Sequence, residues 1–192
     1  LKIKNSKNYL ILIKHPLSSE IDDSYNQMKK SLIVIEKFCL QNNYNTICIA
    51  PNSDPGSHEI IKAASEYKQK KWFYYFETLH RDYFINLVRN ANALIGNSSM
   101  GILEAPYYKL PVINIGNRQL GRLNAGNVIF TNYNTKKILK AISTSCFDKK
   151  YLKKIKNLKN PYGDNTAAKK IRIIIESVNT KDKKWYVKKT LC

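Results

Sequence analysis

The stretch of sequence that decides the fold is residues 95–104, which read IGNSSMGILE. The apolar residues up to Gly96 predict a buried strand. Three small polar residues follow, and the pattern after them predicts a helix over Ser99–Tyr108. A strand that passes through a short glycine-containing loop into a helix is the repeating unit of parallel α/β sheets.

The polar residues of this stretch have two interpretations. A reciprocal capping box requires Glu or Gln three positions after the capping residue, but the positions three beyond Asn97–Ser99 hold Met100, Gly101 and Ile102. Backbone N–H groups are therefore left for an anion such as phosphate at the positive end of the helix. A plain serine N-cap accounts for the same residues, and this stretch alone does not separate the two interpretations.

Glu104 favours the anion-binding interpretation. It lies among Ile102, Leu103 and Ala105, where a carboxylate without a partner is costly, so we expect it to be buried and functional. Side chains of a helix lean toward its N-terminus, and Glu104 follows Ser98 by roughly 9 Å of helical rise. This geometry suits a nucleotide whose phosphate lies at the helix start and whose sugar hydroxyls meet the carboxylate. An exposed helical glutamate is the alternative.

Strands and helices alternate along the chain up to residue 131. The predicted strands are apolar on both faces, which is typical of strands inside a parallel sheet. Strands are expected at residues 8–16, 45–50, 72–77, 92–96, 111–116 and 127–131, and helices at 18–43, 59–69, 81–89, 99–108, 135–145, 148–158 and 166–178. The sequence thus predicts an α/β fold with a doubly wound, Rossmann-like parallel sheet in one domain over residues 1–178, followed by a basic tail over residues 179–192.

Candidate ligand-binding residues follow each of the first five predicted strands. Ligands of doubly wound sheets bind outside the carboxyl ends of the strands, so these residues are expected to meet at one edge. They are His15, Asn52, Leu79, Ser98 with Ser99, and Arg118. Arg122 follows Arg118 by four positions, and the two arginines could bind a diphosphate. Surface arginines, a turn histidine and a turn asparagine are the corresponding alternatives.

The charge of the chain is strongly positive. Lys and Arg total 33 of the 192 residues against 14 acids, which gives a net charge of +19. Because lysine, asparagine, isoleucine and tyrosine are abundant throughout, a solvated basic surface is favoured over a nucleic-acid footprint. No apolar run approaches the ~20 residues of a membrane span. The expectation is a cytoplasmic protein that binds neither nucleic acid nor membrane.

Several classes of site are not predicted. The four cysteines, Cys39, Cys48, Cys146 and Cys192, are far apart, and the three histidines are scattered, so no metal site is expected. The chain has no P-loop or dinucleotide-binding glycine pattern. Ser98 lacks the surroundings of a hydrolase nucleophile elbow. No cofactor is expected.

Five motifs in order along the chain resemble a known family. They are KHP (14–16), PNSDPGS (51–57), LIGNSSMGILEAP (94–106), PVINIGNRQLGR (111–122) and NPYGD (160–164). Together they resemble the C-terminal domain of the hydrolysing UDP-N-acetylglucosamine 2-epimerases of the sialic-acid and related nonulosonate pathways. Non-hydrolysing relatives carry a Ser-Gly-Gly…Glu-Glu block and a Thr-Glu-Arg-Pro block, which this chain lacks.

The resemblance implies a two-domain, glycosyltransferase-B-like enzyme of which this chain is the UDP-binding half. It implies that the serines contact the diphosphate, that Glu104 contacts the ribose, and that a backbone group of Leu79 lies near the uracil. The matching positions for UDP are Ser98, Ser99, Glu104, Arg118, His15, Asn52 and Leu79, with Arg122 as a possible addition. The implied reaction eliminates UDP across C1–C2 of the sugar and adds water to the glycal, which yields the 2-epimeric sugar without metal or redox cofactor.

One departure from the family limits this expectation. The family's proton-transfer carboxylates lie in an N-terminal domain that this chain does not contain, so no catalytic residue is named here. We expect UDP binding without turnover, the missing domain as partner, and assembly into a homo-oligomer. Three alternatives remain: a UDP-sugar glycosyltransferase of the same fold, a basic nucleic-acid-binding module with steeply salt-dependent affinity, and a non-catalytic regulatory or structural half-domain.

Overall fold

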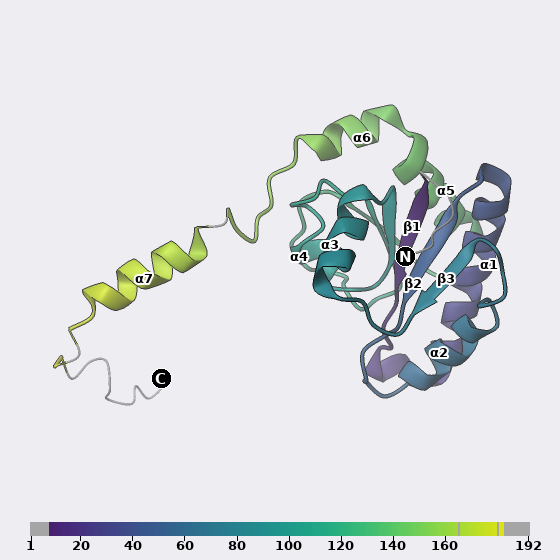
Figure 1. The fold of residues 1–192 in the computed structure, drawn as a ribbon, viewed down its shortest axis with the longest axis horizontal. Coiled ribbons are helices and arrows are strands. Elements are labelled where there is room, and N and C mark those ends of the chain that lie inside the picture. Colours follow the sequence, from purple (N-terminus) through teal and green to yellow (C-terminus); the bar gives the residue numbers. More distant parts are fainter. Residues whose placement is uncertain (1–7, 165, 180, 183–192) are drawn as a thin grey trace. The chain divides into compact units, whose positions relative to one another are not determined.

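The computed structural model describes residues 8–164, 166–179 and 181–182. Its centre is one six-stranded sheet in the order β3-β2-β1-β4-β5-β6, in which every neighbouring pair is parallel (Figure 1). The strands are β1 (Tyr9–Ile13), β2 (Asn45–Ile49), β3 (Phe73–Phe76), β4 (Ala93–Gly96), β5 (Val112–Ile115) and β6 (Val128–Thr131). The predicted doubly wound α/β fold is confirmed.

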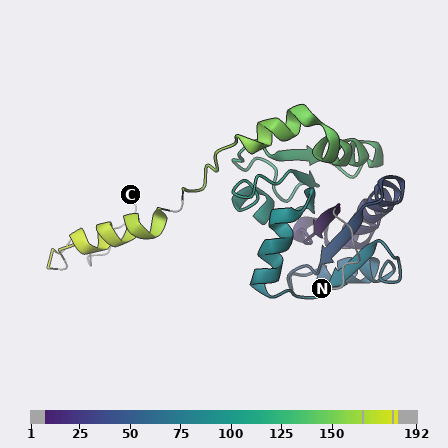
Figure 2. The same ribbon diagram turned by 45° about the horizontal axis from the view of Figure 1, so that its top comes forward.

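Helices connect the strands and cover both faces of the sheet. They are the 3-10 helix η1 (Ser18–Asp23) and the α-helices α1 (Ser24–Asn42), α2 (Ser57–Ser65), α3 (Arg81–Asn90), α4 (Met100–Leu103), α5 (Thr135–Phe147), α6 (Lys149–Lys156) and α7 (Ala167–Ser177). Figures 1 and 2 show α1 and α2 along one face of the sheet and α3 on the other. None of the helices within the described ranges is long and apolar enough to cross a membrane.

The two apolar faces of the strands explain this layering. Leu10 and Leu12 of β1 belong to a core cluster with residues of α1, α2 and α5. Ile11 and Ile13 belong to a second cluster, which contains Val88 of α3. Because successive strand residues point to opposite faces, an unbroken apolar run fills both cores. That run therefore specifies a central strand with a helical layer on each side.

The strand order reverses beside β1. The chain runs outward from β1 through β2 to β3, and then returns to the other side of β1 to continue with β4, β5 and β6. At this switch point Ile13 pairs in register with Ile49 on one side and with Gly96 on the other. The loops after β1 and β4 diverge from here, which is where doubly wound sheets form their ligand crevice.

The helix predicted over Ser99–Tyr108 is much shorter in the structure. α4 ends at Leu103, and turns continue to Lys109, whose φ is +55°. The physical reason is Pro106, which has no N–H to donate and whose ring disfavours helical geometry at the preceding residue. The chain turns instead through hydrogen bonds from Ala105 N to Met100 O (2.9 Å) and from Leu110 N to Ala105 O (3.1 Å).

The chain divides into two compact units between Pro161 and Tyr162. The second unit contains α7, an amphipathic helix on which Ile171, Ile173, Ile174 and Ile175 are each more than half exposed. The domain boundary expected at residue 178 stays a prediction. Most of the tail expected over residues 179–192 lies outside the described residues.

Candidate functional site at the carboxyl edge of the sheet

Asn97 joins the two loops at the switch point. It is 3% exposed, and its side chain forms a reciprocal pair with the backbone of His15. Its Oδ1 accepts from His15 N at 2.7 Å, and its Nδ2 donates to His15 O at 2.8 Å. The Asn97 backbone N–H also donates to Ile13 O at 3.2 Å. These bonds fix the positions of His15 and of the turn that begins at Asn97.

The loop after β5 is attached to the same residue. Arg118 Nη1 and Gln119 Nε2 each donate to the Asn97 carbonyl at 3.1 Å. Gln119 Oε1 in turn accepts from Arg122 Nη1 at 2.8 Å. Arg118 is half-buried and stands directly against the Asn97–Ser99 turn, whereas Arg122 is exposed and reaches it only through Gln119. The structure thus brings one predicted arginine to the turn and places the other one step away.

His15 meets Asn52 across the gap between β1 and β2. The Asn52 backbone N–H donates to His15 Nδ1 at 3.1 Å, and Asn52 Oδ1 lies 3.1 Å from the same nitrogen. Burial lowers the pKa of His15, and the nearby positive charge of Arg118 lowers it further. The neutral ring that accepts at Nδ1 carries its proton on Nε2. In that tautomer His15 can donate one hydrogen bond from Nε2 to a ligand, whereas the tautomer that donates from Nδ1 to Asn52 Oδ1 accepts at Nε2.

The turn over Ser98 and Ser99 provides free donors. Ser98 Oγ accepts weakly from Met100 N at 3.4 Å, and Ser99, the residue before α4, makes no side-chain cap. Within the described residues, the backbone N–H groups of Ser98 and Ser99 have no acceptor. An anion would supply the acceptor that these groups lack. Because α4 is only four residues long, the individual N–H groups and hydroxyls contribute more here than a helix dipole does.

Gly96 makes this turn possible. Its φ is +133°, and a Cβ atom at this position would lie 1.9 Å from Ile13 O. Only glycine allows β4 to end this close to the backbone of β1. The close approach places the Asn97–Ser99 turn directly beside His15.

The burial expected for Glu104 was wrong. Its side chain is exposed, and among the described residues it makes no hydrogen bond or ion pair. The cause is the early end of α4: Glu104 is the C-cap residue, with φ −110°, and not the second turn of a continuing helix. Its carboxylate is open to a ligand but is not held in place by the protein.

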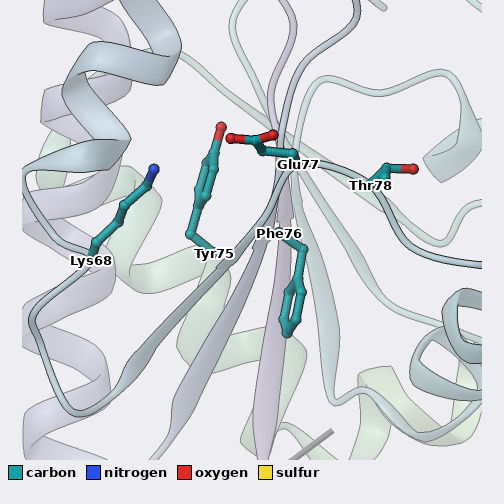
Figure 3. A pocket seen from close by; sticks show the side chains of 5 residues that line it. All are labelled: Lys68, Tyr75, Phe76, Glu77 and Thr78. Carbon is teal, nitrogen blue, oxygen red and sulfur yellow. The ribbon is translucent and has the colours of Figure 1, made fainter.

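Leu79 lies in the loop after β3, at the same edge of the sheet, and is half-buried. Beside this loop a pocket of about 480 Å³ is lined by Lys68, Tyr75, Phe76, Glu77 and Thr78 (Figure 3). The Lys68 ammonium stands 4.3 Å from the centre of the Tyr75 ring, and the Tyr75 hydroxyl is buried without a partner in the described part of the chain. None of the contacts above ties Leu79 to the turn at Ser98.

A polar network next to the site was missed by the sequence analysis. It consists of Lys14, Glu20, Gln27, Asn117 and Tyr133, joined by side-chain hydrogen bonds. The sequence contains one indication of this network, because Lys14 is a charged residue directly after the apolar run of β1. No group of three or more His, Cys, Asp or Glu residues in the described ranges could hold a metal ion.

Comparisons with known proteins identify the family of the chain. The family described as UDP-N-acetylglucosamine 2-epimerase matches residues 1–176. A UDP-N-acetylglucosamine 2-epimerase of Neisseria meningitidis is 35% identical over 140 residues, 73% of this chain and 36% of that protein. A hydrolysing UDP-N,N'-diacetylbacillosamine 2-epimerase of Legionella pneumophila is 31% identical over 172 residues, 90% of this chain and 43% of that protein.

Solved structures share the fold. A crystal structure of the UDP-GlcNAc 2-epimerase of Neisseria meningitidis bound to UDP-GlcNAc has a TM-score of 0.70 at 18% identity, and the match covers 91% of this chain and 46% of that one. The Methanocaldococcus jannaschii enzyme in complex with UDP-GlcNAc and UDP has a TM-score of 0.67 at 19% identity, over 88% and 45%. The chain thus spans less than half the length of each of these relatives. By its sequence and its fold, this chain belongs to the UDP-N-acetylglucosamine 2-epimerase family.

Proposed function

We propose that this chain is the UDP-binding, C-terminal half of a hydrolysing UDP-N-acetylglucosamine 2-epimerase. The observation that carries the proposal is the pair of N–H groups of Ser98 and Ser99, which lack an acceptor next to the anchored Arg118. Unfilled donors beside a guanidinium at the switch point of a parallel sheet suit a diphosphate. The second half of the enzyme completes the sugar pocket.

Each predicted residue has a role in this arrangement. The serine N–H groups and hydroxyls bind the diphosphate, and Arg118 adds a positive charge. His15 donates from Nε2, and Asn52 keeps its Nδ1 occupied. Glu104 accepts from the ribose hydroxyls, a backbone group of Leu79 lies near the uracil, and Arg122 closes over the phosphates from the loop.

The reaction breaks the bond between C1 of the sugar and the oxygen of the diphosphate. The electron pair of that bond goes to UDP as the proton at C2 is removed, which leaves a glycal, and water then adds across the double bond to give the 2-epimer. The donors around Ser98 and Arg118 stabilise the negative charge on the departing UDP. The base that removes the C2 proton must lie within hydrogen-bond reach of the sugar, and we assign it to the missing half. This chain alone is therefore expected to bind UDP without turnover.

Calorimetric titration of the 192-residue chain with UDP, GDP and uridine tests the proposal. We expect UDP to bind at least about tenfold more tightly than uridine, since charge-assisted hydrogen bonds to the diphosphate contribute about 1.5–3 kcal/mol each. GDP should bind more weakly than UDP. Glu104→Ala should weaken UDP binding, whereas Glu59→Ala, a half-buried position on α2, should leave UDP affinity unchanged.

Two results would contradict the proposal. Equal affinity for UDP and uridine would show that the diphosphate does not contribute to binding. Affinity that collapses with salt and shows no preference among nucleotides would favour the nucleic-acid alternative. Release of UDP from UDP-N-acetylglucosamine by this chain alone would overturn the assignment of the acid–base groups to the other half.

A further inference from the structure

Lys14 is the most deeply buried charged residue of the described chain. It is 2% exposed and ends the apolar run of β1, directly before His15. Its Nζ donates to Tyr133 Oη at 2.8 Å and to Gln27 Oε1 at 3.3 Å, and it lies 4.9 Å from the centre of the Tyr133 ring. A buried ammonium is costly even with such partners. A methionine or leucine would fill the same space without that cost.

The partners of Lys14 form a chain of hydrogen bonds that leads to the loop after β5, which carries Arg118. The Tyr133 hydroxyl donates to Gln27 Oε1 at 2.6 Å. Gln27 Nε2 donates to Glu20 Oε2 at 2.7 Å. The other carboxylate oxygen of Glu20 accepts from Asn117 Nδ2 at 2.9 Å. Asn117 directly precedes Arg118, so the chain ends at the loop that presents the arginine.

Tyr133 also supports the start of this loop. A Cβ atom added at Gly116 would lie 2.4 Å from the Tyr133 hydroxyl. The ring therefore packs against the point where the loop leaves β5. A change that moves Tyr133 would remove this packing contact just before Asn117 and Arg118.

The charges around Lys14 come from several elements. Glu20 and Asp23 belong to η1, His15 follows in the chain, Arg118 lies on the loop after β5, and Tyr133 follows β6. Burial lowers the pKa of Lys14 to about 8, with Glu20 acting in the opposite direction and Arg118 in the same direction. At neutral pH Lys14 is therefore mostly charged.

We propose that Lys14 is a positioning residue of the diphosphate site: through Tyr133, Gln27, Glu20 and Asn117 it sets the position of the loop that carries Arg118, and it adds positive charge behind that loop. The inference rests on the proposed function, since it names the residue behind the same site. It predicts that substitution of Lys14 lowers the affinity for ligands that carry phosphates and leaves the affinity for the nucleoside unchanged.

The first test compares Lys14→Met with Lys150→Met, which removes one exposed lysine of α6 from the same chain. Calorimetry at pH 7 should show UDP affinity reduced on the order of tenfold in Lys14→Met, the scale of losing one partly screened positive charge. Uridine affinity should be unchanged in Lys14→Met. Lys150→Met should match the wild type for both ligands, and circular dichroism should show that both variants fold.

The pH dependence provides a second readout. Between pH 7 and pH 9.5 the wild type should lose UDP affinity as Lys14 deprotonates, because both the charge and its hydrogen bonds weaken. The affinity of Lys14→Met should change less over that interval. His15 does not contribute there, because its lowered pKa leaves the ring neutral throughout.

A third variant separates positioning from simple electrostatics. Glu20→Gln removes a negative charge near the site, which by charge alone would strengthen UDP binding. It also leaves only one oxygen for two donors, Gln27 Nε2 and Asn117 Nδ2, so the positioning role predicts weaker UDP binding and unchanged uridine binding.

The outcomes distinguish this inference from the proposed function. If the wild type does not bind UDP, the proposed function fails. If the wild type binds UDP and both Lys14→Met and Glu20→Gln bind it as tightly, the inference is overturned and the function stands. If Lys14→Met does not fold, Glu20→Gln and the wild-type pH profile decide: tighter UDP binding by Glu20→Gln, or a flat profile, overturns the inference.

Discussion

Replacing Asn97 by alanine should break the hydrogen bonds that join the loop after β1 to the loop after β4. The substitution removes the acceptor of His15 N (2.7 Å) and the donor to His15 O (2.8 Å). Asn97 is 3% exposed and both hydrogen bonds are partly buried, so water replaces the lost partners only in part. An unsatisfied buried polar group costs about 1–3 kcal/mol, and two such groups together cost at most about 2–6 kcal/mol. Since domains are stable by about 5–15 kcal/mol, the variant should still fold.

Urea unfolding followed by circular dichroism measures this loss. The midpoint should fall while the slope with urea stays the same, because the folded state remains equally compact. The matched control is Asn86→Ala on the exposed face of α3, where the side chain donates only to Asp82 O at 2.8 Å. That variant should change the free energy of unfolding by no more than about 0.5 kcal/mol.

The comparison between the two asparagines decides the result. If Asn97→Ala and Asn86→Ala lose the same small amount, the reciprocal pair with His15 does not stabilise the junction, and the reasoning from burial is refuted. If the reasoning holds, UDP affinity should also fall in Asn97→Ala, since His15 is no longer fixed beside the Ser98 turn. Asn86→Ala should bind UDP as the wild type does.

The remaining predictions concern the backbone, a charge and a thiol. Gly96→Ala should abolish soluble folded protein, because its Cβ would lie 1.9 Å from a carbonyl oxygen, whereas Gly121→Ala, with φ +77° and open space around it, should cost about 1–2 kcal/mol in thermal unfolding. Burial lowers the pKa of Lys14 from 10.5 to about 8, so between pH 8 and pH 10.5 the unfolded state binds more protons than the folded state. The free energy of unfolding of the wild type should therefore rise between these two pH values, by roughly 3 kcal/mol relative to Lys14→Met. Burial raises the pKa of the Cys48 thiol, and alkylation at pH 8 should modify Cys48 only when urea unfolds the chain.

The fold could be read from the sequence because its strands are buried on both faces. Runs such as Tyr9–Ile13 and Ala93–Gly96 carry no charged or amide side chain, and helical patterns separate them, so a parallel sheet between two helical layers satisfies them. The end of α4 was misjudged for a local reason. The apolar residues around Glu104 suggested a continuing helix, but Pro106 stops it.

The site could be predicted only where its residues lie at strand ends. His15, Ser98 and Arg118 were found because chain order alone places them at one edge of the sheet. The network behind them was not found, since its bonds join residues far apart, such as Lys14 and Tyr133 at a separation of 119 positions. No periodicity in a sequence encodes such a pairing; it exists only once the sheet has closed.

The strand order has a consequence for how the protein folds. No neighbouring strands in this sheet are joined by a hairpin, and the pairing of β1 with β4 brings together Ile13 and Gly96 across one 3-10 helix and three α-helices. Such non-local contacts form slowly, because a long loop must be closed before any contact stabilises it. The hydrogen-bonded pair between the Asn97 side chain and the His15 backbone, 82 positions apart, can form only at that step. Competence to bind a diphosphate should consequently appear late in refolding, together with the central pairing of the sheet and after the helices have formed.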